Sequence, residues 1–285
     1  MGKSSHLRPS LIIISIAMCA ALYAVGSYIT AYIPSPWGAG QFRPAVIIPS
    51  FFAVIFGPLP AGLGAAIGTL IADSVKHGYL YPGSYLAAVP GNFLGFYLFG
   101  YITNKKFTWG RFVFASNLTL TLANFIVASL YVLVFKILYL GQESYINLSP
   151  DALAFFIIGL TIWWFVTMLP FVLLVTPLLI RAAAMAFPSI VPSDVRTNSL
   201  KEEIPKKTFS LAMLVPGLIM LLIGLTVTYT ALGVRMTGFF GAITMTLVQY
   251  MFYLSGAVLT IIGLLTWRAP FKEKEKRNVE VVSKT

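Results

Sequence analysis

Residues 44–75, PAVIIPSFFAVIFGPLPAGLGAAIGTLIADSV, decide how this chain folds. The run is apolar almost throughout, as a membrane-spanning helix is, but Pro58 and Pro60 interrupt it. Proline removes a backbone donor and clashes with the preceding helical turn, so one continuous helix is excluded. We therefore expect two short membrane segments, Pro44–Phe56 and Leu59–Val75, joined by a tight turn.

The composition of the chain places it in lipid rather than in water. It has 285 residues, of which 58% are hydrophobic and 10% are charged, and its mean hydropathy is +0.85. A water-soluble domain carries about 25% charged residues, so this chain has too few to cover a globule in water. A soluble enzyme is therefore excluded. The single cysteine, Cys19, lies inside the first apolar run and is interpreted as a small apolar side chain.

Six further apolar runs are long enough to cross a bilayer, which takes about 20 residues. They are Ser10–Ile33, Ser84–Thr103, Arg111–Leu140, Ala152–Arg181, Thr208–Leu232 and Phe239–Trp267. Eight segments in all place every Lys and Arg on the side of the N-terminus except Arg43, Lys76, Lys136 and Arg235. Basic loops mark the cytoplasmic side, so we expect a cell-membrane protein with both termini in the cytoplasm. The same rule accounts for the net charge of +11 without nucleic acid.

The predicted fold is an all-α membrane protein, a polytopic helical bundle built from four parts. Residues 1–185 form a six-span core, and residues 208–267 form an appendix of two transmembrane helices. Residues 186–207 hold prolines and charges, which favours a cytoplasmic linker. Residues 268–285 are rich in lysine and glutamate, which favours a solvated cytoplasmic tail. Because a charged linker separates the two membrane parts, we expect the core to bind its ligand without the appendix.

Small residues recur at every fourth position in three of the predicted segments. These pairs are Ala17 and Ala21, Ala20 and Ala24, Gly64 and Gly68, and Gly91 and Gly95. Lipid supplies no hydrophobic drive between helices, so close approach of two backbones needs such small faces. We expect the glycine pairs to pack inside the monomer. The alanine face of the first segment fits either packing inside the monomer or a partner protein.

Ionisable, amide and aromatic side chains favour an outward-facing ligand cavity. Its predicted lining is Arg43, Asp73, Tyr85, Asn92, Asn124, Lys136 and Trp163. Charges inside a membrane favour a site because they are costly there, although charges at helix ends can also snorkel to the interface. In a small-molecule pocket an aromatic ring can stack on the ligand while amides bind its edge. Trp164 is an alternative to Trp163, and we expect the Ser35–Gln41 loop to close the cavity.

Sequence templates for catalysis and for metal binding are missing. The two histidines, His6 and His77, stand in neither a His-Glu-x-x-His nor a His-x-x-Glu-His spacing. Gly2-Lys3-Ser4 matches the end of a phosphate-binding loop, but no glycine precedes it and no strand leads into it. We therefore expect no catalytic residue, no metal site, no cofactor and no ATPase site in this chain.

Two segments resemble the S components of energy-coupling factor (ECF) transporters. The first runs from Gln41 to Asp73, with an apolar second span, a Phe-Gly-Pro turn at residues 56–58 and a glycine- and alanine-rich third span that ends in aspartate. The second is VPGNFLG at residues 89–95. The resemblance covers about Ser10–Arg181, so it makes the six-span core S-component-like and leaves the last two helices outside the usual unit.

The resemblance implies a substrate-capture subunit that binds a vitamin or a similar small water-soluble metabolite from outside. In that family a transmembrane coupling protein and two ATPase subunits drive uptake, and the first helix presents an Ala-x-x-x-Ala face to the coupling protein. The matching residues here are Ala17, Ala20, Ala21 and Ala24. The cobalt and nickel branch uses an N-terminal histidine hook, which Gly2-Lys3 does not match.

Two other functions stay open on the sequence. The chain also fits an intramembrane enzyme that acts on a lipid or isoprenoid, with Asp73 and His77 as acid–base groups. It fits, in addition, a non-transporting membrane scaffold that uses the C-terminal helix pair. A vitamin that co-purifies with the protein would favour substrate capture, and turnover of a lipid would favour the enzyme.

Overall fold

Proline and glycine set the break between the second and third segments, as the sequence predicts. In the computed structural model, which describes residues 8–268, the short helices η1 (Pro44–Val46) and α2 (Ile47–Phe56) are followed by α3 (Pro58–His77). Gly57 between them has φ of +89°, a conformation that side chains with a Cβ rarely adopt. The predicted turn is confirmed.

Seven helices within residues 8–268 are long and apolar enough to cross a membrane. They are α1 (Pro9–Ile29), α3, η2 with α4 (Ser84–Ala88 and Val89–Asn104), α5 with η3 (Trp109–Ser129 and Leu130–Tyr139), α7 (Pro150–Ala186), α9 (Lys206–Tyr229) and α11 (Ala242–Arg268). The connections hold α6 (Glu143–Ile146), α8 (Ser193–Lys201) and α10 (Ala231–Phe240). No β-strand occurs in this part of the chain. The predicted all-α, multi-pass bundle is confirmed. The second predicted segment, Pro44–Phe56, is also helical but is shorter than these seven.

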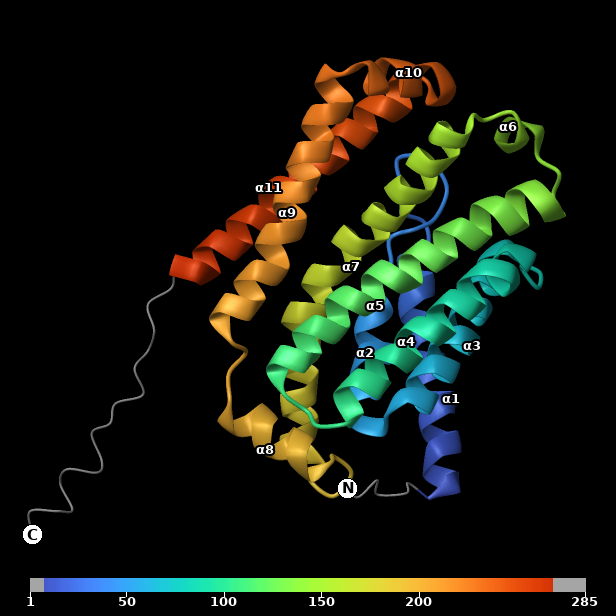
Figure 1. The fold of residues 1–285 in the computed structure, drawn as a ribbon. Helices are drawn as coiled ribbons and strands as arrows, with labels where there is room; N and C mark the ends of the chain where they lie inside the picture. The colour runs from blue at the N-terminus through green and yellow to red at the C-terminus, as the bar shows by residue number, and fades with distance from the viewer. Residues whose placement is uncertain (1–7, 269–285) are drawn as a thin grey trace, which may run out of the picture.

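Glycine lets the core helices approach closely around α3, which packs between α1 and α4 (Figure 1). A Cβ added at Gly64 would lie 2.5 Å from the side chain of Cys19 on α1, and one at Gly68 would lie 2.7 Å from a backbone oxygen of the same helix. On α4, a Cβ at Gly91 would lie 2.4 Å from Val127 of α5, and Gly95 also faces α5. The prediction that the glycine pairs pack inside the monomer is confirmed.

The alanine face of α1 divides into two sides. Ala20 and Ala24 are buried, and the nearby Gly68 packs against the backbone of Ala20, so this side lies inside the bundle. Ala17 and Ala21 are exposed. Of the four alanines predicted as a docking face, the structure therefore leaves only Ala17 and Ala21 open to a partner.

The C-terminal helices α9 and α11 lie side by side as a pair (Figure 1) and bury one another through small residues. A Cβ at Gly217 of α9 would lie 2.6 Å from the Thr260 hydroxyl of α11, and one at Gly263 would lie 2.6 Å from Leu214. Close backbone contact is thus the device that holds this pair together, as it holds the core.

The connection α10 brings the C-terminal pair back to the core at the start of α7. The ring of Phe240 lies 6.1 Å from the ring of Phe155 and 5.8 Å from that of Phe156. Beside them, Arg235 pairs with Asp151, with 3.0 Å between Nη1 and Oδ2. Both charged side chains are well exposed, so this pair adds little stability.

The segment 186–207, predicted as a linker, contains helix α8, which is docked on the α4–α5 connection. The backbone N–H of Phe107 donates to Asp194 Oδ2 at 2.8 Å, and Trp109 Nε1 donates to the carbonyl of Glu202 at 3.0 Å. Arg181 Nε donates to the carbonyl of Ser199 at 3.1 Å. These bonds give the segment a fixed position. Residues 1–7, and the predicted tail beyond Arg268, lie outside the described residues.

Candidate functional site

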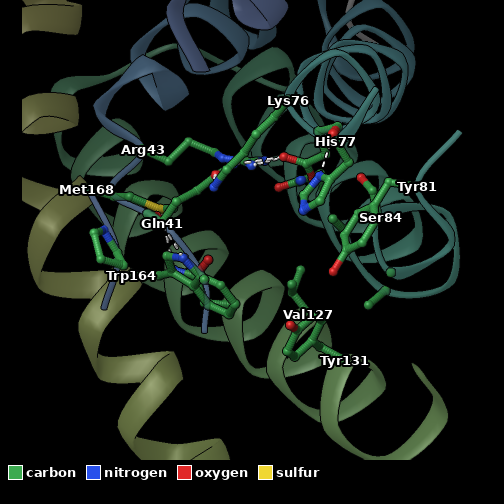
Figure 2. A pocket seen from close by; sticks show the side chains of 18 of the residues that line it. Gln41, Arg43, Lys76, His77, Tyr81, Ser84, Val127, Tyr131, Trp164 and Met168 are labelled. Carbon is green, nitrogen blue, oxygen red and sulfur yellow. Dashed lines mark hydrogen bonds and ion pairs between the residues drawn. The ribbon is translucent and has the colours of Figure 1, made fainter. Parts of the chain in front are cut away.

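A cavity of about 170 Å³ opens among the core helices at the end of the bundle that also carries the α1–η1 loop. The loop, the end of α3, the start of η2 and the helices α4, α5 and α7 all contribute to its wall. In Figure 2 the charged side chains lie together on one side, with Trp164 and Tyr81 on opposite flanks. Four of the seven predicted site residues line it: Arg43, Asp73, Asn92 and Asn124.

Arg43 and Asp73 form a buried ion pair at the cavity wall. Arg43 Nη2 lies 2.6 Å from Asp73 Oδ1, and both side chains are 9% exposed. Gln41 Nε2 donates to the same oxygen at 2.8 Å, and Arg43 Nη1 also donates to Thr69 Oγ1. The pair joins the α1–η1 loop to α3 and leaves Asp73 already engaged before any ligand arrives. Its first task is therefore to hold the wall of the cavity in place.

The α1–η1 loop is fixed over the cavity by two tryptophans of different elements. Trp164 Nε1 on α7 donates to the carbonyl of Gln41 at 3.1 Å, and a Cβ at Gly40 would lie 2.6 Å from the Trp164 ring. Within the loop, the Trp37 ring lies 5.9 Å from that of Phe156. Gly38, Gly40 and Gln41, which belong to the predicted covering loop, line the cavity.

Lys76 and His77 line the same end of the cavity. Lys76 Nζ donates to the carbonyl of Ala31 at 2.6 Å and to Gln41 Oε1 at 2.9 Å. His77 Nδ1 lies 2.7 Å from the carbonyl oxygen of Asp73, so this nitrogen carries the proton of the bond. The imidazole stacks on Tyr81 with 3.9 Å between ring centroids. Burial raises the pKa of Tyr81, which keeps its hydroxyl protonated and able to donate.

Three buried polar side chains face the cavity without adequate partners. Ser84 is 1% exposed and its Oγ makes no hydrogen bond. Asn92, which is 9% exposed, makes no hydrogen bond within the described residues, and Asn124, 5% exposed, only approaches Met168 Sδ at 3.6 Å. Buried polar groups in folded proteins are nearly always bonded, so these three invite a polar ligand or water.

The other three predicted residues do not line the cavity. Tyr85 is 60% exposed, while its neighbour Ser84 faces inward. Lys136 lies over the rings of Tyr131, Phe135 and Tyr145, at 5.4 to 5.7 Å from their centroids. The indole of Trp163 is outside the wall, and Trp164 occupies it instead. Side chains of adjacent helix residues point about 100° apart, so Trp164 faces the cavity while its neighbour Trp163 on α7 does not.

The wall also contains side chains that were not in the predicted lining, among them Lys76, His77, Tyr81, Ser84, Tyr131 and Met168. Lys76 and His77 carried a signal, since both are ionisable residues near the predicted outer ends of helices. Ser84 and Met168 gave no such signal, because a serine or methionine in an apolar run is common.

Among residues 8–268, no three His, Cys, Asp or Glu side chains come together in a way that could hold a metal ion.

No family model, no curated protein and no solved structure matches this chain. Its function is therefore argued from the geometry of the cavity and from the sequence resemblance.

Proposed function

We propose that this protein is the membrane-embedded substrate-capture subunit, or S component, of an ECF-type importer. It binds a vitamin-like, small water-soluble metabolite from outside the cell membrane and docks on a transmembrane coupling protein served by two ATPases. The observation that carries the proposal is the convergence of three buried polar side chains on one cavity: Ser84 and Asn92 make no hydrogen bond there, and Asn124 bonds only the Met168 sulfur. Unbonded polar atoms destabilise the fold by about 1–3 kcal/mol each unless a ligand or water satisfies them.

The composition of the cavity suits a polar ligand with a flat face. Its wall combines aromatic rings, Tyr131 and Trp164 among them, with a few convergent polar groups. Small-molecule sites commonly have this composition: the rings supply contact area and the polar groups fix orientation. In this arrangement Asn92 and Asn124 bind the edge of the ligand, and the α1–η1 loop covers it.

The acid–base alternative finds less support in the same geometry. Asp73 Oδ1 accepts from both Arg43 and Gln41, and His77 bonds the backbone carbonyl of Asp73 rather than its carboxylate. A general base must reach the proton that it removes, and neither group is poised as a dyad with the other. Substrate capture requires no proton transfer, so it is compatible with the bonds that Asp73 and His77 already make.

Mass spectrometry of small molecules bound to detergent-purified protein tests this proposal. We expect a water-soluble metabolite to co-purify, and Asn92→Leu to weaken its binding. Asn117→Leu is the matched control, because Asn117 lies on α5 outside the cavity wall and donates to the carbonyl of Val113 at 3.0 Å. Recovery of lipid alone, with turnover of that lipid, would replace capture by the enzyme.

The orientation that the proposal requires is tested by cysteine labelling. Cysteines at Ser144 and Tyr145 should react with an impermeant reagent from outside, and cysteines at Thr108 and Thr197 only after the membrane is permeabilised, because these four positions are at least partly exposed. External labelling at Thr108 would put the cavity on the wrong side of the membrane for uptake.

The coupling protein docks on the exposed side of α1, which carries Ala17 and Ala21. Ala17→Trp with Ala21→Trp should leave ligand binding near normal while abolishing ATP-driven uptake and co-purification with the coupling module, because two exposed small residues allow close helix contact. The control is Ala20→Trp, which enters the packed α1–α3 contact and should lower stability and binding together. Uptake at the wild-type rate in the double variant would remove α1 as the docking surface.

A further inference from the structure

The cavity carries one cation that no acid neutralises. Arg43 and Asp73 form an ion pair within 4 Å, so the charges of these two residues cancel at the wall. Lys76 also lines the cavity, but its Nζ donates only to two neutral oxygens, of Ala31 and Gln41. The net charge of these three wall residues is therefore positive.

The position of Lys76 makes that charge effective. Its side chain is only partly exposed, and the carboxylate of Asp73 is already shared between Arg43 and Gln41. A charge in a partly dry site acts far more strongly on a neighbour than the same charge in water. An ammonium has three N–H donors, of which two are used here, so one remains for a ligand.

The size of the cavity limits what can accompany an anionic group. Its volume of about 170 Å³ is close to the roughly 150 Å³ of an apolar cavity that holds one benzene molecule. The side walls are formed by Tyr131, Val127 and Trp164. One ring with small substituents fills a volume of this size.

The buried polar side chains of the cavity determine which ring the ligand can carry. Asn92 and Asn124 present amides that both donate and accept, and the Ser84 hydroxyl does the same. A hydrocarbon ring would leave Ser84 and Asn92 unbonded and Asn124 with only the Met168 sulfur, which is costly in a buried site. A ring with nitrogen or oxygen atoms at its edge would satisfy them.

The geometry points to a single-ring heterocyclic carboxylate as the captured ligand, with its carboxylate on Lys76 and its polar edge on Asn92 and Asn124. This inference rests on the proposed capture function and narrows it to one charge class and one size class. Lys76 is then a specificity-determining residue, because it separates an acid from the neutral amide of the same shape.

The test compares matched pairs of probes on the full-length protein in nanodiscs. Pyridine, pyrimidine and imidazole carboxylates are each titrated beside the corresponding carboxamide, with affinity measured by calorimetry and by the shift in thermal unfolding. We expect at least one acid to bind and its amide to bind at least tenfold more weakly. Lys76→Met should weaken the acid by roughly 10- to 100-fold, the loss of a hydrogen bond to a charged group, and should erase the preference over the amide.

Two further variants separate charge from folding. Lys76→Arg keeps the charge and should retain the preference for the acid. Lys105→Met removes a lysine that lies 4.4 Å from the centroid of the Tyr101 ring, and neither residue lines the cavity, so this variant should leave binding unchanged. Equal binding of acid and amide, or an unchanged preference in Lys76→Met, would overturn the inference.

The identity of the co-purified molecule separates failure of this inference from failure of the capture function. A small acid supports both, even where none of the synthetic probes binds. A neutral or cationic metabolite overturns the acid assignment and leaves capture standing. Absence of any bound metabolite, together with no binding of any probe, overturns both.

Discussion

The core around the cavity and the C-terminal pair α9–α11 use the same packing device but differ in what they leave unbonded. Each is held together by glycines, at Gly64 in the core and at Gly217 in the pair. Each also buries hydroxyls without partners, such as Ser84 in the core and Thr260 in the pair. Ser84 faces a cavity, whereas Thr260 packs closely against Gly217 of the facing helix. An unbonded polar atom therefore points to a ligand only where it faces open space.

The two regions also differ in how their charges are placed. The core buries the ion pair of Arg43 and Asp73, and the C-terminal pair meets α7 through the exposed pair of Arg235 and Asp151. A buried pair fixes geometry and is strongly destabilising when half of it is removed, while an exposed pair contributes little. The difference suits a core that maintains a shaped site and an appendix that rests on it.

Breaking the buried pair should have the largest effect. Asp73→Ala leaves the Arg43 guanidinium buried without its partner, and we expect a loss of about 3–5 kcal/mol in the free energy of unfolding. Thermal or denaturant unfolding in detergent measures this loss. A loss below about 1 kcal/mol would show that water reaches the pair and that the wall is not the rigid element described above.

Substitutions that fill the glycine contacts should have the second-largest effect on stability, and their effects on ligand binding should differ between the two regions. Gly64→Ala and Gly217→Ala each force a Cβ to within 2.6 Å of a facing side chain, so we expect about 1–3 kcal/mol of destabilisation from each. Only Gly64→Ala should also weaken ligand binding. The control is Gly110→Ala on α5, where a Cβ meets nothing within 4 Å. Weaker ligand binding in Gly217→Ala would show that the α9–α11 pair contributes to the binding site of the core.

Removing the pair altogether should have a small effect on the ligand. All residues known to line the cavity precede residue 169, so deletion of Thr208–Thr285 should change affinity by less than about threefold. Equilibrium binding of the co-purified ligand to the truncated protein measures this. Loss of binding at normal expression would mean that the contact of Phe240 with Phe155 and Phe156 is needed to hold the Trp37 loop.

The smallest effect is expected at the exposed pair. Asp151→Asn should change the free energy of unfolding by less than about 1 kcal/mol, because Arg235 stays solvated when its partner is lost. The same unfolding experiment used for Asp73→Ala provides the comparison. A loss as large as that of Asp73→Ala would contradict the distinction between the two pairs.

The sequence predicts the helices well because proline, glycine and apolar length act locally. The break at Gly57 and the close contacts of Gly64 and Gly91 follow from such local rules. Helix α8 does not, because the residues that hold it, Phe107 and Trp109, lie far away along the chain. The proline and charge of this segment predicted a linker but gave no indication of the helix within it.

The inward face of a helix proved harder to predict than its length. Tyr85 and Lys136 lie in the π-helical segments η2 and η3, where the turn per residue departs from that of an α-helix and shifts which side chains face inward. Trp163 and Trp164 lie in α7, which is apolar on all sides, so periodicity gives no preferred face. Asn92 and Asn124 were predictable because a buried amide in an apolar run is rare enough to single out.

The most direct measurement of the central claim is the affinity of the co-purified ligand for three variants of equal stability. Asn92→Leu and Asn124→Leu should each weaken binding by about 1–3 kcal/mol, because a hydrogen bond to the ligand is left unmade, while Asn117→Leu should bind as the wild type does. Unchanged affinity in both cavity variants, or an equal loss in all three, would contradict the assignment of this cavity as the capture site.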